Sequence, residues 1–201
     1  MTSDSLPHHH DIAVEYHPLR PFLPADGRLL MLGSFPPPKA KWSMNFFYPN
    51  KQNDMWRIMG LLFFGNKDHF TLPDGRFDQS LVESFCHDRN IALFDTASAV
   101  KRLNNDASDK FLTVVQKSDI ASMLASMPSC DAIAVTGQKA LDTILDTYPA
   151  TPPAIGRYTD LTIADRPIRL YRMPSSSRAY PLAIEKKAAE YEKMFRLEGL
   201  L

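Results

Sequence analysis

The sequence predicts an α/β fold: a three-layer α/β/α sandwich around a central, mainly parallel sheet of four strands. Two observations carry this prediction. First, short apolar runs that fit buried strands alternate along the chain with longer segments whose apolar residues recur at helical spacing. Second, the 201 residues, of which 44% are hydrophobic, suffice for one domain with a full-sized core. Strands that alternate with helices pair in parallel, and the helices then cover both faces of the sheet.

The individual elements follow from these two patterns. Strands are expected at 29–32, 91–94, 132–135 and 168–171, and a hairpin across 165–167 joins the last of them to 161–163. Helices are expected over about 53–64, 78–88 and 117–126, from 138 to just before Pro149, and over 181–197. Polar or turn-forming residues predict loops at 33–52, at 65–77 and through 104–106.

The first 27 residues are expected to form an irregular N-terminal arm, followed by a single domain over residues 28–201. Prolines at positions 18, 21 and 24 favour an extended backbone in this arm. His8–His10 are interpreted as a polar leader. The alternative is a metal site, but His17 is the only other histidine near them in the sequence.

Composition excludes several classes of protein. Basic and acidic residues each number 23, so the net charge is zero, and any phosphate binding must come from a local patch or from backbone N–H groups. Cys86 and Cys130 have no metal-ligand spacing and indicate no disulfide framework. We therefore expect no metal, no cofactor and a reducing cytoplasm. No apolar run approaches the roughly 18 residues of a membrane span, and none is of signal-peptide type.

Two polar loops are expected to carry the chemistry. One begins with Gly33–Pro38 and runs up to Trp56, directly after the strand at 29–32. The other is Met173–Arg178, directly after the strand at 168–171. Because parallel strands end at the same edge of a sheet, these loops should face each other across a cleft, where open α/β sheets bind ligands.

Both loops carry motifs of a known family. The run Tyr48–Trp56 resembles the Tyr-Pro-x-x-x-Asn-x-x-Trp run of mismatch-type uracil/thymine DNA glycosylases, and Met173–Ser177 is similar to their second motif. Gly33–Pro36, taken with Asn53 and Asp95, is closer still to the deoxyinosine (hypoxanthine) branch of the uracil-DNA glycosylase superfamily. The resemblance runs in order through positions 33, 53, 56, 95, 137 and 175 and covers most of residues 29–178.

The resemblance implies a monofunctional DNA glycosylase, which flips a deaminated base (hypoxanthine or uracil) out of DNA and releases it hydrolytically. No lysine nucleophile stands in the motifs, so no strand-cleaving activity is expected. In most of the superfamily an Asp or Asn two residues after the first glycine positions the water, but Phe35 stands there. The deoxyinosine branch also lacks that residue, and there the asparagine that matches Asn53 takes the role.

Asn53 and Asp95 are therefore the expected catalytic residues. A departing base leaves an oxocarbenium-like sugar, so a polar group that positions water and carries partial negative charge assists the reaction. Asp95, at the end of its strand, is expected to accept the ring N–H of the base or to hold the water. Both residues have a structural alternative: Asn53 suits a helix N-cap before Asp54, and Asp95 suits a helix or turn cap.

The remaining site residues are expected to bind the base or the DNA backbone. The base pocket is assigned to Gly33, Ser34, Phe35, Phe47 and Tyr48, with Phe47 as the first candidate for stacking and Phe35 as the second. For most aromatic residues of this loop, which include Trp42 and Phe46, packing onto the domain is the alternative. Phosphate contacts are assigned to Lys51, Ser175, Ser176, Ser177 and Arg178. Arg178 either enters the gap that the flipped nucleotide leaves or binds a flanking phosphate.

Two other functions stay open at this point. A catalytically inactive nucleic-acid or nucleotide-binding module of the same fold is the main alternative, because phenylalanine at position 35 cannot activate water. A small-molecule hydrolase lacks support, since the chain contains no Gly-x-Ser-x-Gly elbow. The expected partner is DNA with a deaminated base, and the expected oligomeric state is a monomer.

Overall fold

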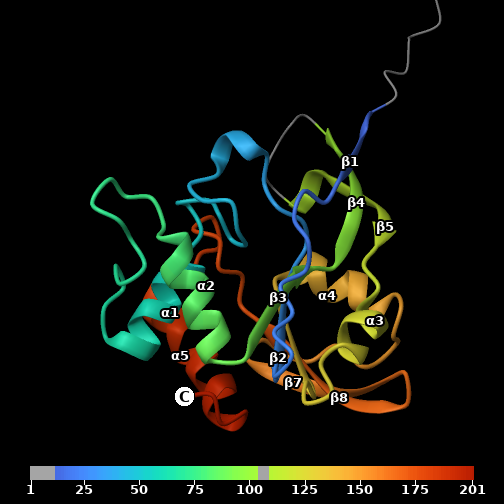
Figure 1. The fold of residues 1–201 in the computed structure, drawn as a ribbon. Coiled ribbons are helices and arrows are strands. Elements are labelled where there is room, and N and C mark those ends of the chain that lie inside the picture. Colours follow the sequence, from blue (N-terminus) through green and yellow to red (C-terminus); the bar gives the residue numbers. More distant parts are fainter. Residues whose placement is uncertain (1–11, 104–108) are drawn as a thin grey trace, which may run out of the picture.

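A five-stranded sheet forms the centre of the protein, as the computed structural model shows for residues 12–103 and 109–201 (Figure 1). His8–His10 and the loop expected at 104–106 lie outside these described residues. The strands follow the order β3-β2-β6-β8-β7. They are β2 (Leu29–Gly33), β3 (Ile91–Asp95), β6 (Ala132–Thr136), β7 (Arg157–Ile163) and β8 (Arg166–Met173).

The α/β class is confirmed, but the strand count of four is wrong. The four expected strands are present, and β3, β2, β6 and β8 pair in parallel. The fifth strand, β7, pairs antiparallel with β8 over a much longer hairpin than expected. Ala164 and Asp165 connect the two strands with φ of 49° and 61°, the left-handed conformation that two-residue hairpin turns adopt. This tight turn lets pairing continue from Ile163↔Arg166 to Arg157↔Arg172.

A second, antiparallel sheet of three strands was not expected from the sequence. It follows the order β1-β4-β5 and consists of β1 (Val14–Tyr16), β4 (Ala97–Arg102) and β5 (Leu112–Lys117). Residues 14–16 therefore form a strand rather than an irregular arm, and a simple three-layer sandwich is an incomplete description. The pairing of β1 with β4 joins residues that are more than 80 positions apart, such as Val14 and Lys101, and no local pattern indicates such a contact.

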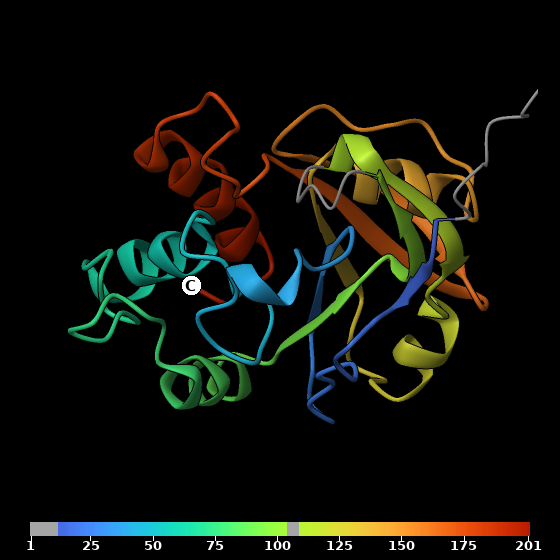
Figure 2. The same cartoon turned by 90° about the horizontal axis from the view of Figure 1, so that it is seen from above.

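Helices lie on both sides of the central sheet (Figures 1 and 2). On one side are α1 (Met55–Phe64), α2 (Gln79–Asp88) and α5 (Ile184–Leu197), and on the other are α3 (Ile120–Ala125) and α4 (Gln138–Leu145). Two short 3-10 helices, η1 (Lys39–Lys41) and η3 (Asp109–Phe111), lie in the loops. None of the helices in the two described ranges is long and apolar enough to cross a membrane.

The core forms because the central strands are apolar on both faces. Every residue of β2, β3 and β6 is buried, as expected for parallel strands covered by helices on each side. Trp56 of α1 is the largest fully buried side chain, and its Nε1 donates to the Phe47 carbonyl over 3.0 Å. This bond attaches the loop before α1 to the helix. Cys86 and Cys130 are buried free thiols.

Replacement of Trp56 by alanine tests how much this packing contributes. We expect a loss of about 3–5 kcal/mol in the free energy of unfolding, because the change leaves a cavity and an unpaired carbonyl. Urea denaturation of the purified variant measures it. Leu197→Ala is the control: this side chain is 63% exposed, so its loss should cost less than about 0.5 kcal/mol. Equal losses in the two variants would contradict the assignment of Trp56 to the core.

Candidate active site

A cleft of about 690 Å³ opens above the carboxyl ends of the parallel strands. The register explains its position, because Gly33 of β2 is level with Asp95 of β3, and Thr136 of β6 is level with Met173 of β8. Neighbouring strands therefore end at one edge, where the loops that follow them meet. Ten residues proposed from the sequence line this cleft: Gly33, Ser34, Phe35, Tyr48, Asn53, Asp95, Ser175, Ser176, Ser177 and Arg178.

Two of the proposed residues do not line the cleft. Phe47 is buried in the core, where its ring lies 6.1 Å from that of Phe94. Its face is therefore unavailable to a base in the cleft, and the expectation that it stacks on one is wrong. Lys51 is exposed beside the cleft, with its Nζ 3.5 Å from the Asp74 carbonyl. The sequence alone could not show that Tyr48 lines the cleft and Phe47 does not. In an irregular loop, unlike in a strand, the side chains of adjacent residues do not point to opposite sides in a regular pattern.

Asn53 lies one residue before Asp54, which occupies the N-cap position of α1, so the expected N-cap role of Asn53 is wrong in position. Its Oδ1 nevertheless accepts the Met55 N–H, the first backbone N–H of α1, over 2.9 Å. This bond identifies the oxygen of the carboxamide, since a backbone N–H needs an acceptor. Within the described residues, Nδ2 has no hydrogen-bond partner, and the side chain lines the cleft. Asn53 therefore holds an NH₂ donor in the cleft on a side chain that the helix fixes.

Asp95 lies at the end of β3 with its carboxylate held on one side. Its Oδ2 is 2.8 Å from Nε2 of His17, a residue of the N-terminal arm. Its Oδ1 has no hydrogen bond to any residue of the described ranges and lies against Gly33. A Cβ atom at position 33 would collide with this oxygen, so the carboxylate requires a glycine there. Asp95 thus has one oxygen bound to His17 and a second oxygen that can accept a hydrogen bond from a ligand.

Tyr48 and Thr136 form the wall between Asp95 and the loop that follows β8. The Tyr48 hydroxyl lies 3.1 Å from Thr136 Oγ1. Burial raises the pKa of Tyr48, and the charge of Asp95 raises it further, so the phenol stays protonated. Tyr48 has a φ of 50°, which lies in the left-handed region. A tyrosine adopts this strained backbone conformation only where surrounding contacts hold it there. These contacts define one rigid side of the cleft.

Phe35, Ser34 and Asp109 form another part of the cleft wall. Phe35 is largely buried against Ala97, Val100 and Leu112 of the small sheet, so this sheet supports the cleft from behind. Ser34 donates a hydrogen bond from its hydroxyl to Asp109, which also lines the cleft. Although Asp109 is exposed as a residue, partial desolvation of its carboxyl among the surrounding atoms raises the pKa, and the bond from Ser34 opposes this shift. This wall therefore contains a second carboxyl group.

The two predicted loops are joined directly by backbone hydrogen bonds. Asp54 N donates to the Ser176 carbonyl over 2.7 Å, and Arg178 N donates to the Gln52 carbonyl over 2.9 Å. Asn53 and Ser177 accordingly form an antiparallel bridge. Ser176 is buried, and its carbonyl is held by this contact. The loops therefore do not merely face each other: they form one continuous edge of the cleft.

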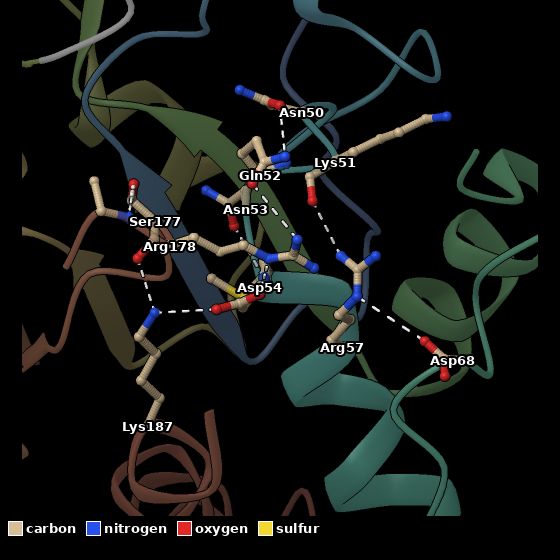
Figure 3. A network of polar contacts seen from close by, with 12 residues as sticks. Asn50, Lys51, Gln52, Asn53, Asp54, Arg57, Asp68, Ser177, Arg178 and Lys187 are labelled. Carbon is tan, nitrogen blue, oxygen red and sulfur yellow. Dashed lines mark hydrogen bonds and ion pairs between the residues drawn. The ribbon is translucent and has the colours of Figure 1, made fainter. Parts of the chain in front are cut away.

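A buried carboxylate stabilises this junction (Figure 3). Asp54 Oδ1 accepts from Arg178 Nε over 2.9 Å, and Oδ2 lies 3.1 Å from Nζ of Lys187 on α5. Lys187, with a side chain only 1% exposed, also donates to the Ser177 carbonyl over 2.8 Å. Buried charges are stable only when paired and hydrogen-bonded, as they are here. One network thus connects α1, the loop after β8 and α5.

Further charged residues surround this network, although the whole chain is neutral. Arg57 donates to the Lys51 carbonyl and lies 4.0 Å from Asp68, close to the Asp54 network (Figure 3). Burial and the neighbouring Arg178 lower the pKa of Arg57. Beside the Asp54 network, Lys51 and Arg57 thus add two cations, and Asp68 adds one carboxylate.

Several site residues were missed from the sequence: His17, Asp54, Asp109, Thr136 and Lys187. Asp54 follows Asn53 and Thr136 precedes Gly137, and both of these neighbours belong to the motifs. The motifs could therefore have indicated that Asp54 and Thr136 lie near the site. His17 and Lys187 gave no such signal, because each reaches the site from a distant segment. As for metals, no group of three or more His, Cys, Asp or Glu residues in the described ranges could hold an ion.

Comparisons with known proteins bear on the fold. No family model and no curated protein matches the chain significantly. The structure is similar to a solution NMR structure of "a putative Uracil DNA glycosylase from Methanosarcina acetivorans", with a TM-score of 0.64 and 19% sequence identity. The likeness covers 93% of this chain and 99% of that one. The two proteins therefore share their fold over nearly their full length.

Replacement of Lys187 by methionine tests the junction. The variant keeps most of the side-chain volume but leaves the buried Asp54 with Arg178 alone, and we expect it to lose about 3–5 kcal/mol of unfolding free energy. Urea denaturation measures the loss. Lys186→Met is the matched control, because this neighbouring lysine is exposed. If both variants are as stable as the wild type, the Asp54 network does not stabilise the junction.

Proposed function

We propose that this protein is a monofunctional DNA glycosylase that releases a deaminated base, hypoxanthine or uracil, from DNA by hydrolysis. One observation carries the proposal. The amide donor of Asn53 and the carboxylate acceptor of Asp95, each without a described protein partner at its available atom, line one cleft above the ends of parallel strands. The shared fold with the Methanosarcina acetivorans structure supports it. So do the sequence motifs in the two loops.

The two groups suit the two charges that the reaction creates. As the bond between base and sugar breaks, positive charge develops on the sugar and negative charge on the base. The available Asp95 oxygen can stabilise the first charge and accept a proton from the attacking water. The Asn53 NH₂ group can donate to a carbonyl oxygen of the departing base. Because the Asn53 oxygen is occupied by Met55 N–H, we assign the water to Asp95 and the donor role to Asn53.

The cleft also offers surfaces for the base and the sugar–phosphate backbone. Phe35 and Tyr48 line it and replace Phe47 as the proposed aromatic contacts of the base. Ser175, Ser177 and Arg178 line its other edge and are proposed to contact phosphates. Arg178 is paired with Asp54 through Nε, which favours a phosphate contact over insertion into the DNA stack. Lys51 remains a proposed phosphate contact on the rim. A monomer in the cytoplasm stays a prediction.

Base release from labelled oligonucleotides tests the proposal. Each duplex carries one hypoxanthine, one uracil or one mismatched thymine, and alkali cleaves any abasic site that forms. We expect the wild type to act on hypoxanthine or uracil and Asn53→Asp to be slower by roughly 100-fold or more, because it loses the donor. The aspartate can still accept Met55 N–H, so the thermal unfolding midpoint should not change. Asn45→Ala, an exposed change in the same loop, is the control.

Gly33→Ala tests the role of Asp95 without altering a polar group. The added methyl group collides with Oδ1 and forces the carboxylate away from its position. A displacement of about 1 Å can reduce a reaction rate roughly 100-fold, so we expect a loss of that order in single-turnover base release. Circular dichroism checks that the fold is retained. A variant as active as the wild type would exclude Asp95 from catalysis.

The binding-module alternative predicts a different result in the same assay. Phe35, which stands where most of the superfamily has a water-positioning residue, is the observation that favours it. If the wild type binds the oligonucleotides but releases no base from any of them, this alternative replaces the proposed enzyme.

A further inference from the structure

The N-terminal arm delivers a histidine to the cleft from far along the chain. His17 stands 78 positions before Asp95, and its Nε2 lies 2.8 Å from Asp95 Oδ2. Its side chain is only 3% exposed, although the carboxylate that it contacts lines the cleft. None of the motifs in the two loops includes this residue.

The imidazole ring has one defined position. Its centroid lies 4.4 Å from that of Phe94, 5.4 Å from Phe35 and 6.2 Å from Phe47, so aromatic rings enclose it. The backbone of the arm is fixed as well, because His17 N donates to the Ser98 carbonyl over 2.8 Å. In these surroundings an unpaired polar ring would be costly, and Leu19 and Asp95 supply its partners.

The contacts of the other ring nitrogen decide which atom carries the proton. Nδ1 lies 3.1 Å from the Leu19 N–H and 2.9 Å from the Leu19 carbonyl. If Nδ1 accepts from the N–H, the neutral ring carries its proton on Nε2. If the ring is doubly protonated, Nδ1 donates to the carbonyl and Nε2 is protonated again. In both forms Nε2 donates to Asp95. The neutral tautomer with its proton on Nδ1 is unfavourable, because its Nε2 lone pair would face the negatively charged carboxylate.

We propose that His17 is a positioning residue, which orients Asp95 for base release. Its Nε2–H occupies Oδ2 and prevents rotation of the carboxylate, so that Oδ1 remains directed along Gly33 toward the cleft. A carboxylate held in this position can stabilise a cationic sugar. This inference rests on the proposed glycosylase function. It makes the N-terminal arm part of the active site.

Two substitutions separate the hydrogen bond from the packing of the ring. His17→Phe keeps an aromatic ring in the aromatic surroundings but cannot donate to Asp95. His17→Gln gives up the ring but retains an N–H donor of similar reach. We expect His17→Phe to lower the single-turnover rate of base release roughly 10- to 100-fold, since hydrogen bonds to charged groups contribute that much. Affinity for the same DNA should stay within about twofold of the wild type. His17→Gln should recover part of the lost rate.

A double-mutant cycle tests whether His17 acts through Asp95. If it does, His17→Phe combined with Asp95→Asn will be no slower than Asp95→Asn alone. A structural role of the arm would instead slow both backgrounds equally and lower the thermal midpoint. Tyr16→Phe is the control, because this adjacent residue of the arm is 73% exposed. It should leave rate and affinity unchanged.

The outcomes distinguish this inference from the function on which it rests. A wild type that releases no base from any oligonucleotide overturns the proposed function, and the role of His17 falls with it. An active wild type with an equally active His17→Phe variant overturns only the inference. An equal loss in both backgrounds of the cycle also overturns it, because His17 would then not act through Asp95.

Discussion

Four parallel strands end at the same edge of the central sheet, and the rest of the site depends on this constraint. Parallel hydrogen bonding in register brings the carboxyl ends of β3, β2, β6 and β8 to one edge. The residues that end three of these strands, Asp95, Gly33 and Thr136, therefore become neighbours although they are far apart in the chain. A shift of one residue in any strand would turn its side chains to the opposite face and dismantle the cleft.

The junction between the two loops converts this edge into a rigid site. Backbone bonds between 52–54 and 176–178 fix the distance between the loops, and the buried Asp54 adds charged contacts to Arg178 and Lys187. An enzyme that must hold a base and a water at defined positions gains from such preorganisation, since its groups need no rearrangement during the reaction. Of the two cations in this network, Arg178 lines the cleft and Lys187 is buried.

The small antiparallel sheet gives the N-terminal arm a function in the architecture. Its strand β1 pairs with β4, which directly follows Asp95, so the arm is attached beside the cleft. Phe35 packs on the same sheet, and His17 lies between Phe35 and Asp95. Residues 14–17 thereby support two residues of the proposed site. The prolines of the arm help, because they restrict the unfolded arm to extended conformations.

The sequence by itself determined the α/β class, the central strands, the helices and most residues of the cleft. These features depend on local patterns: apolar runs, helical spacing, and the polar residues that end a strand such as Gly33 and Asp95. Only the tertiary structure decided that His17 and Lys187 belong to the site, that Phe47 does not, and that a second sheet exists. Each of these depends on contacts between residues far apart in the chain or on the direction of a side chain in an irregular loop. No local periodicity encodes either, because both arise only when the folded segments pack together.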